Sequence, residues 1–315
     1  MLSRRLLRVK VMQMVYAYYN QGDTSLQQAE KELFHSISKS YELYHIYLLL
    51  LLELRLHEEK RIDLNRQKRI PSPEDLNPNT RFIDNKLLDF LGGNRSLLRY
   101  IEATHISWVD HPELIRQLFT EIRQSQIYID YMALPESDYE TDRKFLVKLV
   151  EKVIAPFEPL YVHFEEQGIY WNDEAEFVVS MVIKTLKEYR DDLGEEQTLL
   201  PEFKDPDDRE FVKTLFRKAI LNQAEFRKLI DAHTKNWDLE RVAFLDIVLM
   251  QIALSEIFEF TNIPVKVTLN EYIELAKHYS TAKSGVFING VLDKVVEQLQ
   301  KDNKLFKSVL NVAAE

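Results

Sequence analysis

The chain contains no cysteine and little glycine. Among its 315 residues, cysteine is absent and only 7 are glycine. The absence of cysteine excludes disulfides, thiol catalysis and zinc sites with cysteine ligands. It also fits a reducing compartment, and we expect a cytoplasmic protein. The scarcity of glycine argues against a turn-rich β protein.

The chain also lacks a hydrophobic run that is long enough to cross a membrane. The most apolar stretch, residues 47–52, is followed by Glu53 and Arg55. It is far shorter than the roughly 20 residues that a spanning helix needs. The N-terminus has arginines but no apolar segment with a small-residue cleavage site, which argues against a signal peptide. We therefore expect no membrane association.

Motifs for catalysis and metal binding are missing as well. The sequence has no GxxxxGK[ST] phosphate loop, no GxSxG elbow and no HExxH zinc site. The eight histidines are scattered, and the closest pair, His105 and His111, lacks a helical metal-binding spacing. The sequence thus predicts a protein that is not an enzyme and has no metal or cofactor.

Helical periodicity is what the chain has in abundance. Leucine and charged residues dominate long stretches in which apolar positions recur every three or four residues, and this pattern predicts an all-α fold. The expected helices are 3–20, 25–69, 84–91, 95–103, 112–132, 142–166, 173–189, 208–222, 224–234 and 239–260. Two more amphipathic helices, joined by a short basic turn, are expected in 263–295.

The charge of the chain is acidic overall but unevenly distributed. The formal net charge is −10, which by itself disfavours nucleic-acid binding. The first ten residues, however, hold Arg4, Arg5, Arg8 and Lys10 without an acid. Cations in the first turns of a helix oppose its dipole. Either these side chains bind a ligand, or they form a solvated basic terminus.

Several motifs along the chain together resemble the family of the transcription antitermination factor NusB. They are RRLLR at 4–8 with QMVYA at 13–17, DREFV at 208–212, Trp237 with ERV at 240–242 and IALSE at 252–256, PVKV at 264–267, NE at 270–271, IELAK at 273–277, and Ser284 and Phe287 with NGVLDK at 289–294. The resemblance covers about 40% of the chain. It implies a NusB-like helical bundle that is interrupted by an additional helical lobe.

The resemblance also implies a division of the chain. Residues 1–38 and 208–305 are expected to form a discontinuous NusB-like RNA-binding domain, and 39–207 an inserted helical region. A shift of 66 positions overlays 142–189 on 208–255, with Asp142 on Asp208 and Trp171 on Trp237. This pattern predicts a partial duplication within 134–190. Chance similarity between amphipathic helices is the alternative.

The family's activity implies a function for this chain. It is expected to bind boxA-type single-stranded RNA together with the NusE ribosomal protein, as part of the transcription elongation complex. The alternative is a protein-binding scaffold with a NusB-like fold and reduced RNA binding, in which the inserted region carries the function.

The expected RNA-binding residues lie at the two ends of the resemblance. Single-stranded RNA is held through its phosphates and by stacking on its bases. The residues are Arg4, Arg5 and Arg8 in the first helix, Lys283 and Ser284 in the last turn, and, as weaker choices, Lys277 and Lys266. In some family members an acid stands at the position of Lys283, and a lysine there favours RNA. Tyr16 and Phe287 can stack on bases, although core packing is the preferred interpretation for both.

Overall fold

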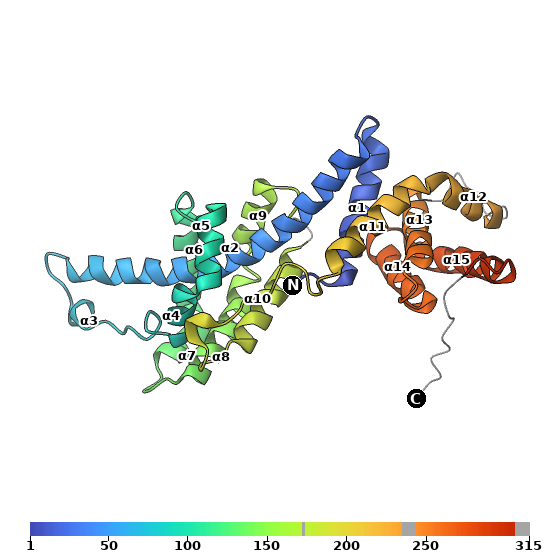
Figure 1. Ribbon diagram of the computed structural model, residues 1–315. Coiled ribbons are helices and arrows are strands. Elements are labelled where there is room, and N and C mark those ends of the chain that lie inside the picture. Colours follow the sequence, from blue (N-terminus) through green and yellow to red (C-terminus); the bar gives the residue numbers. More distant parts are fainter. Residues whose placement is uncertain (172–173, 235–242, 306–315) are drawn as a thin grey trace. The chain divides into compact units, whose positions relative to one another are not determined.

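The structure is a computed structural model that describes residues 1–171, 174–234 and 243–305 (Figure 1). Within these ranges the chain is helical, and the single β-bridge joins Leu2 to Phe203. The predicted all-α class is therefore confirmed. No helix in the described ranges has the length and apolar character that crossing a membrane requires.

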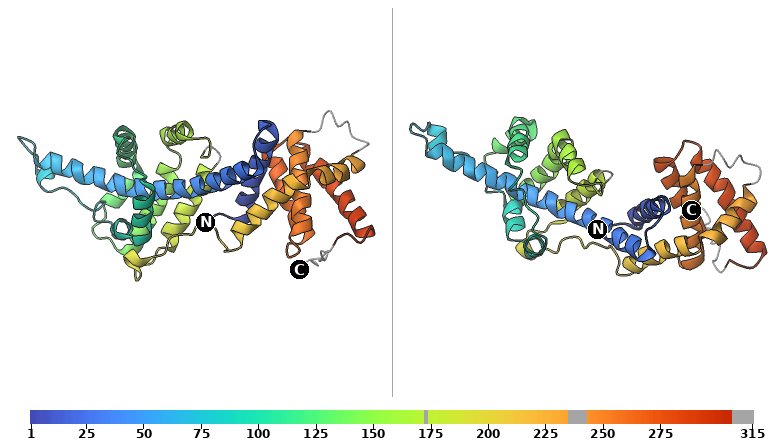
Figure 2. Two further views of the ribbon diagram at one scale, coloured as in Figure 1. Left: turned by 45° about the horizontal axis from the view of Figure 1, so that its top comes forward. Right: turned by 90° about the horizontal axis from the view of Figure 1, so that it is seen from above.

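The chain divides into two compact units. Unit 1 comprises Met1 and Ser38–Glu202, and unit 2 comprises Leu2–Ile37 together with the chain from Phe203 onward. The sequence prediction places these boundaries at residues 38 and 208. Helix α2 (Leu26–Arg66) has 41 residues, and it begins in unit 2 and continues in unit 1. Both views of Figure 2 draw it as one continuous helix.

Unit 2 is built around one fully enclosed helix. Every residue of α13 (Phe244–Glu259) from Asp246 to Ile257 is buried, as expected for a helix that is apolar on all sides. The neighbours of α13 are α1 (Arg4–Gln21), α11 (Asp208–Leu221), α12 (Gln223–His233), α14 (Val265–Tyr279) and α15 (Ser284–Lys301). The helices of the RNA-binding prediction therefore share one core.

Unit 1 contains the remaining helices. After α2 come α3 (Pro73–Leu76), α4 (Lys86–Gly93), α5 (Arg95–Thr104), α6 (Pro112–Gln124), α7 (Gln126–Met132), α8 (Tyr139–Leu149), the π-helical turn η1 (Val150–Ile154), α9 (Glu158–Gln167), α10 (Ala175–Glu188) and the 3-10 turn η2 (Gly194–Glu196). Aromatic side chains fill much of the core, among them Tyr44, Phe82 and Phe119.

Two of the expected helices are broken in the structure, and both breaks have local causes. The helix expected over 112–132 is divided at Ser125, whose hydroxyl accepts a hydrogen bond from the amide of Tyr128 and starts α7. The helix expected over 142–166 is divided after η1, and Pro159 stands in the first turn of α9, where its missing N–H leaves no bond unmade. The short α3 was not expected, although Pro73 at its first turn suits a helix start.

The predicted duplication can be compared with the observed helices. The shift of 66 moves α8 with η1 to 205–220, α9 to 224–233 and α10 to 241–254, close to the bounds of α11, α12 and α13. The overlaid Asp142 and Asp208 are both buried. Trp237 and residues 240–242 lie outside the described residues. The superposition of the two segments stays a prediction.

Candidate nucleic-acid interface

Arg5 is the most exposed of the three arginines of α1. Its side chain is 58% exposed, and it donates hydrogen bonds of 3.0 and 2.8 Å to the two carboxylate oxygens of Glu271 on α14. These hydrogen bonds lower the pKa of the Glu271 carboxyl and raise the pKa of Arg5. Because an exposed ion pair contributes only about 0–1 kcal/mol, a phosphate can replace Glu271 at low cost.

Arg8 lies in the interior, three residues farther along α1. Its side chain is 5% exposed and donates hydrogen bonds of 2.7 and 2.8 Å to Glu256, which is fully buried on α13. Thr268 and Tyr272 of α14 donate to the same carboxylate at 2.9 and 3.0 Å. Burial would lower the pKa of Arg8, but the hydrogen bonds and charge of Glu256 outweigh it and raise that pKa. A contact between Arg8 and a ligand would require this network to open.

Arg4 is intermediate between these two cases. Its side chain is 34% exposed, and its Nε donates to the buried carboxylate of Asp208 at 2.9 Å. Its guanidinium also stacks over the ring of Phe211, 5.0 Å from the centroid. Arg4 thus fastens α1 to the start of α11 and still presents part of its guanidinium to solvent.

The turn between α14 and α15 combines a buried anchor with an exposed cation. Ser284 is 1% exposed, and its hydroxyl donates to Asp246 of α13 at 2.8 Å. Ser280 donates to the other oxygen of the same carboxylate at 2.6 Å. Lys283, directly before Ser284, is exposed and has no ion pair among the described residues. The two serines therefore fix the position of the Lys283 backbone.

Lys277 and Lys266 are both exposed on α14. They are eleven residues apart, which places them on the same side of the helix, roughly 16 Å apart along its axis. Lys277 pairs with Glu274 at 2.6 Å, whereas Lys266 has no ion pair among the described residues. The stem of Lys277 also lies beside Gly285, where a Cβ would stand 3.4 Å from its Cγ. The lack of a side chain at Gly285 therefore leaves room for the stem of Lys277 at the start of α15.

Three of these side chains lie beside the middle of α14 or farther along it. Arg5 reaches Glu271 in the middle of the helix, Lys277 follows about 9 Å farther along the axis, and Lys283 stands just beyond its end. We call Arg5, Lys277 and Lys283 the α14 surface. It brings residues 5 and 283, which are far apart in sequence, to the same helix, with Glu271 and Lys277 roughly 120° apart around α14.

The two aromatic residues named from the sequence have different environments. Phe287 is 6% exposed in the core of unit 2, in agreement with the preferred packing interpretation. Tyr16 is 42% exposed, and its ring centroid lies 5.5 Å from that of Phe244, which is 41% exposed. Tyr16 stands eleven residues after Arg5 and hence on the same side of α1. It is available for stacking.

The acidic partners of the site were not singled out from the sequence. Asp208, Glu256 and Glu271 each occur inside a motif that carries the NusB resemblance. The arginines that neutralise them all lie in a different motif, RRLLR at 4–8, so the available signal was the joint presence of these motifs in one family pattern.

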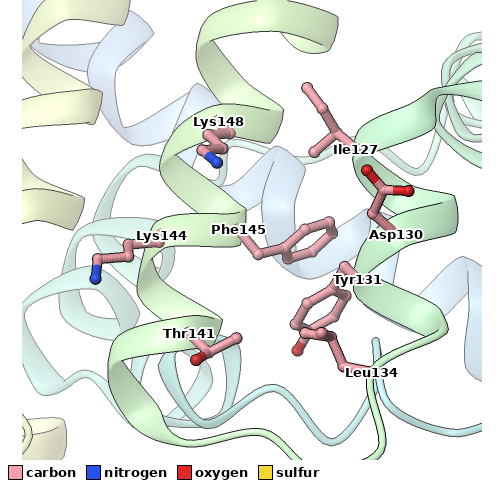
Figure 3. Close-up of a pocket in the computed structure, with 8 residues that line it drawn as sticks. All are labelled: Ile127, Asp130, Tyr131, Leu134, Thr141, Lys144, Phe145 and Lys148. Carbon is pink, nitrogen blue, oxygen red and sulfur yellow. The ribbon is translucent and has the colours of Figure 1, made fainter.

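Unit 1 contains a separate pocket of about 280 Å³ between α7 and α8. Figure 3 shows Tyr131 and Phe145 side by side in it, and their rings stack with centroids 3.7 Å apart. Lys144 and Lys148 of α8 and Asp130 of α7 complete its rim. No histidine or cysteine is among the described lining residues. The pocket thus combines an apolar floor with charges of both signs.

Comparison with known proteins gives one family. Residues 176–297 match the NusB family model. The Transcription antitermination protein NusB of Salinibacter ruber is 38% identical over 109 residues, which are 35% of this chain and 68% of that protein. The protein of the same name from Dictyoglomus turgidum is 33% identical over 129 residues, which are 40% of this chain and 88% of that protein. A solved structure of T. maritima NusB is 26% identical and covers 46% of this chain and 87% of that one, with a TM-score of 0.29.

Proposed function

Because this chain belongs to the NusB family, we propose that it acts in transcription antitermination and binds boxA-type single-stranded RNA together with the NusE ribosomal protein. It then works in the cytoplasm at the transcription elongation complex. Its role there is binding, without a catalytic step.

The observation that carries the RNA assignment is the α14 surface. Arg5, Lys277 and Lys283 are exposed, and their acidic partners, where they have them, are exposed or half-buried. Phosphates can therefore displace Glu271 and Glu274 without leaving a buried charge unpaired. Counterion release from the RNA drives such contacts.

The remaining predicted residues take different roles in this proposal. Lys266 adds an exposed cation on the side of α14 that carries Lys277, and Arg4 adds a partly exposed guanidinium at the start of α1. Arg8 and Ser284 are positioning residues, because their side chains are buried and bonded to Glu256 and Asp246. Tyr16 is the side chain on which a base stacks.

The test is fluorescence anisotropy with boxA RNA over a series of salt concentrations. Arg5→Ala and Lys283→Ala each weaken binding and flatten the log–log salt dependence by about 0.7, the value for one lost phosphate contact on a single strand. Lys228→Ala, which removes an exposed charge from α12 of the same unit, is the matched control and leaves both quantities unchanged. Equal slopes for all three variants would remove the α14 surface from the RNA site.

The same titrations test the role of the partner protein. Purified NusE ribosomal protein is added at a fixed concentration, and the proposal expects it to tighten RNA binding by the wild-type chain. The second candidate function, a protein-binding scaffold, is favoured by the apolar pocket with its lysine rim in unit 1 (Figure 3). Absence of RNA binding both with and without NusE would support the scaffold.

A further inference from the structure

The end of α2 carries a dense run of basic residues inside unit 1. Residues 60–69 contain five basic side chains and the single acid Asp63; the five are Lys60, Arg61, Arg66, Lys68 and Arg69. Elsewhere in unit 1 acidic residues outnumber basic ones. We propose that this basic end of α2 is a second RNA-binding surface, which contacts phosphates outside the segment that unit 2 binds. The inference rests on the proposed function in RNA binding.

Two of these cations, with a third from α6, have no ion pair among the described residues. Lys60 and Arg69 are exposed and unpaired, as is Arg123. Arg123 lines the same cavity of about 290 Å³ as Arg61 and Asn65 of α2, so it lies at the same end of unit 1. The same cavity is also lined by Glu58, Glu74 and Asp75, so the proposed attraction of polyanions rests on the exposed cations that form no ion pair with these acids.

Arg66 adds a fourth available cation, whereas Arg61 does not. Arg66 is exposed and lies 3.8 Å from the exposed Asp63, a pair that a phosphate can replace. Arg61 instead donates two hydrogen bonds of 2.6 Å to Glu58, a buried residue. Arg61 therefore belongs to the packing of α2 and is excluded from the proposed contacts.

The chain after α2 is held in a defined turn. Lys68 binds both carboxylate oxygens of Asp75 at 3.1 Å, and Asp75 forms a capping box with Ser72 at the start of α3. Asn79 then donates to the carbonyl of Met132 at 2.7 Å. These bonds restrict the segment that carries Arg69, which reduces the entropy lost when a ligand binds.

The exposure of the region favours RNA over a membrane surface. The end of α2 and the following loop project beyond the neighbouring helices of unit 1 in Figures 1 and 2. Leu64 is 68% exposed and Ile70 is 86% exposed. Lys60, Leu64 and Gln67 share the solvent-facing side of the helix. A helix that lies in a membrane interface needs a broad apolar face. The exposed aliphatic side chains here are Leu64, Ile70 and Leu76, and of these three only Leu64 lies on α2, so they do not form such a face.

The experiment compares two triple variants of the full chain on two RNAs. Lys60→Ala/Arg66→Ala/Arg69→Ala removes the proposed contacts. Lys152→Ala/Lys184→Ala/Lys187→Ala removes the same charge from exposed positions elsewhere in unit 1. One RNA is boxA alone, about 12 nucleotides, and the other carries flanking sequence to about 40 nucleotides. Circular dichroism confirms that both variants are folded.

The expected results separate the two proposals. On the long RNA, the α2 variant loses about tenfold in affinity near 0.1 M salt, and its log–log slope is flatter by about 2 than that of the control. On the short RNA, both variants bind like the wild type. Equal slopes of the two variants on the long RNA would overturn the inference. If no protein binds the short RNA, the α14 proposal fails, while the long RNA still tests the end of α2.

A membrane role has its own assay. Vesicles of phosphatidylglycerol and phosphatidylcholine are sedimented with the wild type and the α2 variant. The inference expects little sedimentation with either protein. The α2 substitutions could instead abolish sedimentation with the vesicles and leave the salt slope of RNA binding unchanged. This result would show that the end of α2 binds an anionic lipid surface and not RNA.

Discussion

Unit 1 and unit 2 each contain a cluster of basic residues in sequence, but their acidic partners come from different places. The arginines of α1 bind acids on α11, α13 and α14, more than two hundred residues away. The paired basic residues at the end of α2 bind acids within seven residues along the chain. Distant partners join different helices, whereas local partners belong to the same stretch of chain, and either kind can be buried, as Glu256 and Glu58 are. A basic cluster in a sequence therefore does not reveal which of its charges a ligand can reach.

The largest test of this difference is the buried pair of unit 2. Arg8→Ala leaves the carboxylate of Glu256 without its cation, and we expect a loss of about 3–5 kcal/mol in the free energy of unfolding. Arg5→Ala, in the exposed pair, is expected to cost less than about 1 kcal/mol. Urea unfolding followed by circular dichroism measures both. If Arg8→Ala lowers the free energy of unfolding as little as Arg5→Ala does, the buried pair contributes no more to stability than the exposed pair, and the comparison fails.

The second test concerns a buried titratable group of unit 1. His45 is 2% exposed, stacks on Tyr100 with centroids 3.6 Å apart, and contacts the carbonyl of Tyr41. Burial lowers its pKa to about 4, so the unfolded chain takes up a proton first. Stability is full above about pH 6.5 and falls as the pH drops toward 4, with a loss of about 2 kcal/mol at pH 5.

Urea unfolding at pH 7.5 and pH 5 measures this loss. His45→Gln removes the titrating group, and the difference between the two pH values becomes smaller. The lowered pKa values of His57 and His163 leave a residual dependence. An unchanged difference in the variant would show that His45 does not titrate in this range.

A third, smaller effect is expected at the turn that carries Lys283. Ser284→Ala removes one of the two hydroxyls that bind the buried carboxylate of Asp246. We expect a loss of about 1–2 kcal/mol in unfolding free energy and weaker boxA RNA binding, because Lys283 is no longer held in place. Lys283→Ala is the counterpart that weakens RNA binding at constant stability. Equal stability of Ser284→Ala and the wild type would contradict the anchoring role.

The smallest expected effect tests competition at the exposed pair. Glu271→Gln removes the carboxylate that occupies Arg5 and lies 3.6 Å from Arg8. RNA affinity is expected to rise by about two- to fivefold, because a surface pair contributes about 0.5–1 kcal/mol. Anisotropy titration at low salt measures the change, and Glu297→Gln on an exposed position of α15 is the control. A decrease in affinity would mean that Glu271 orients Arg5 for RNA.

Much of the fold could be predicted from the sequence, because helices have a period of 3.6 residues that the apolar pattern displays. The expected helices over 3–20 and 208–222 correspond closely to α1 and α11. The breaks at Ser125 and after η1 were missed. The apolar pattern continues across both breaks. A capping serine starts the new helix at the first break, and a proline stands in the first turn of the new helix at the second.

The sequence by itself determined the helical class, the family and the position of the basic residues. Only the tertiary structure decided which of those residues a ligand can reach. Arg5 and Arg8 are one helical turn apart and look equivalent in the sequence. In the structure, however, the side chain of Arg5 is 58% exposed and that of Arg8 is 5% exposed. The reason is that burial depends on which distant helices pack against α1, and a local pattern does not contain that information.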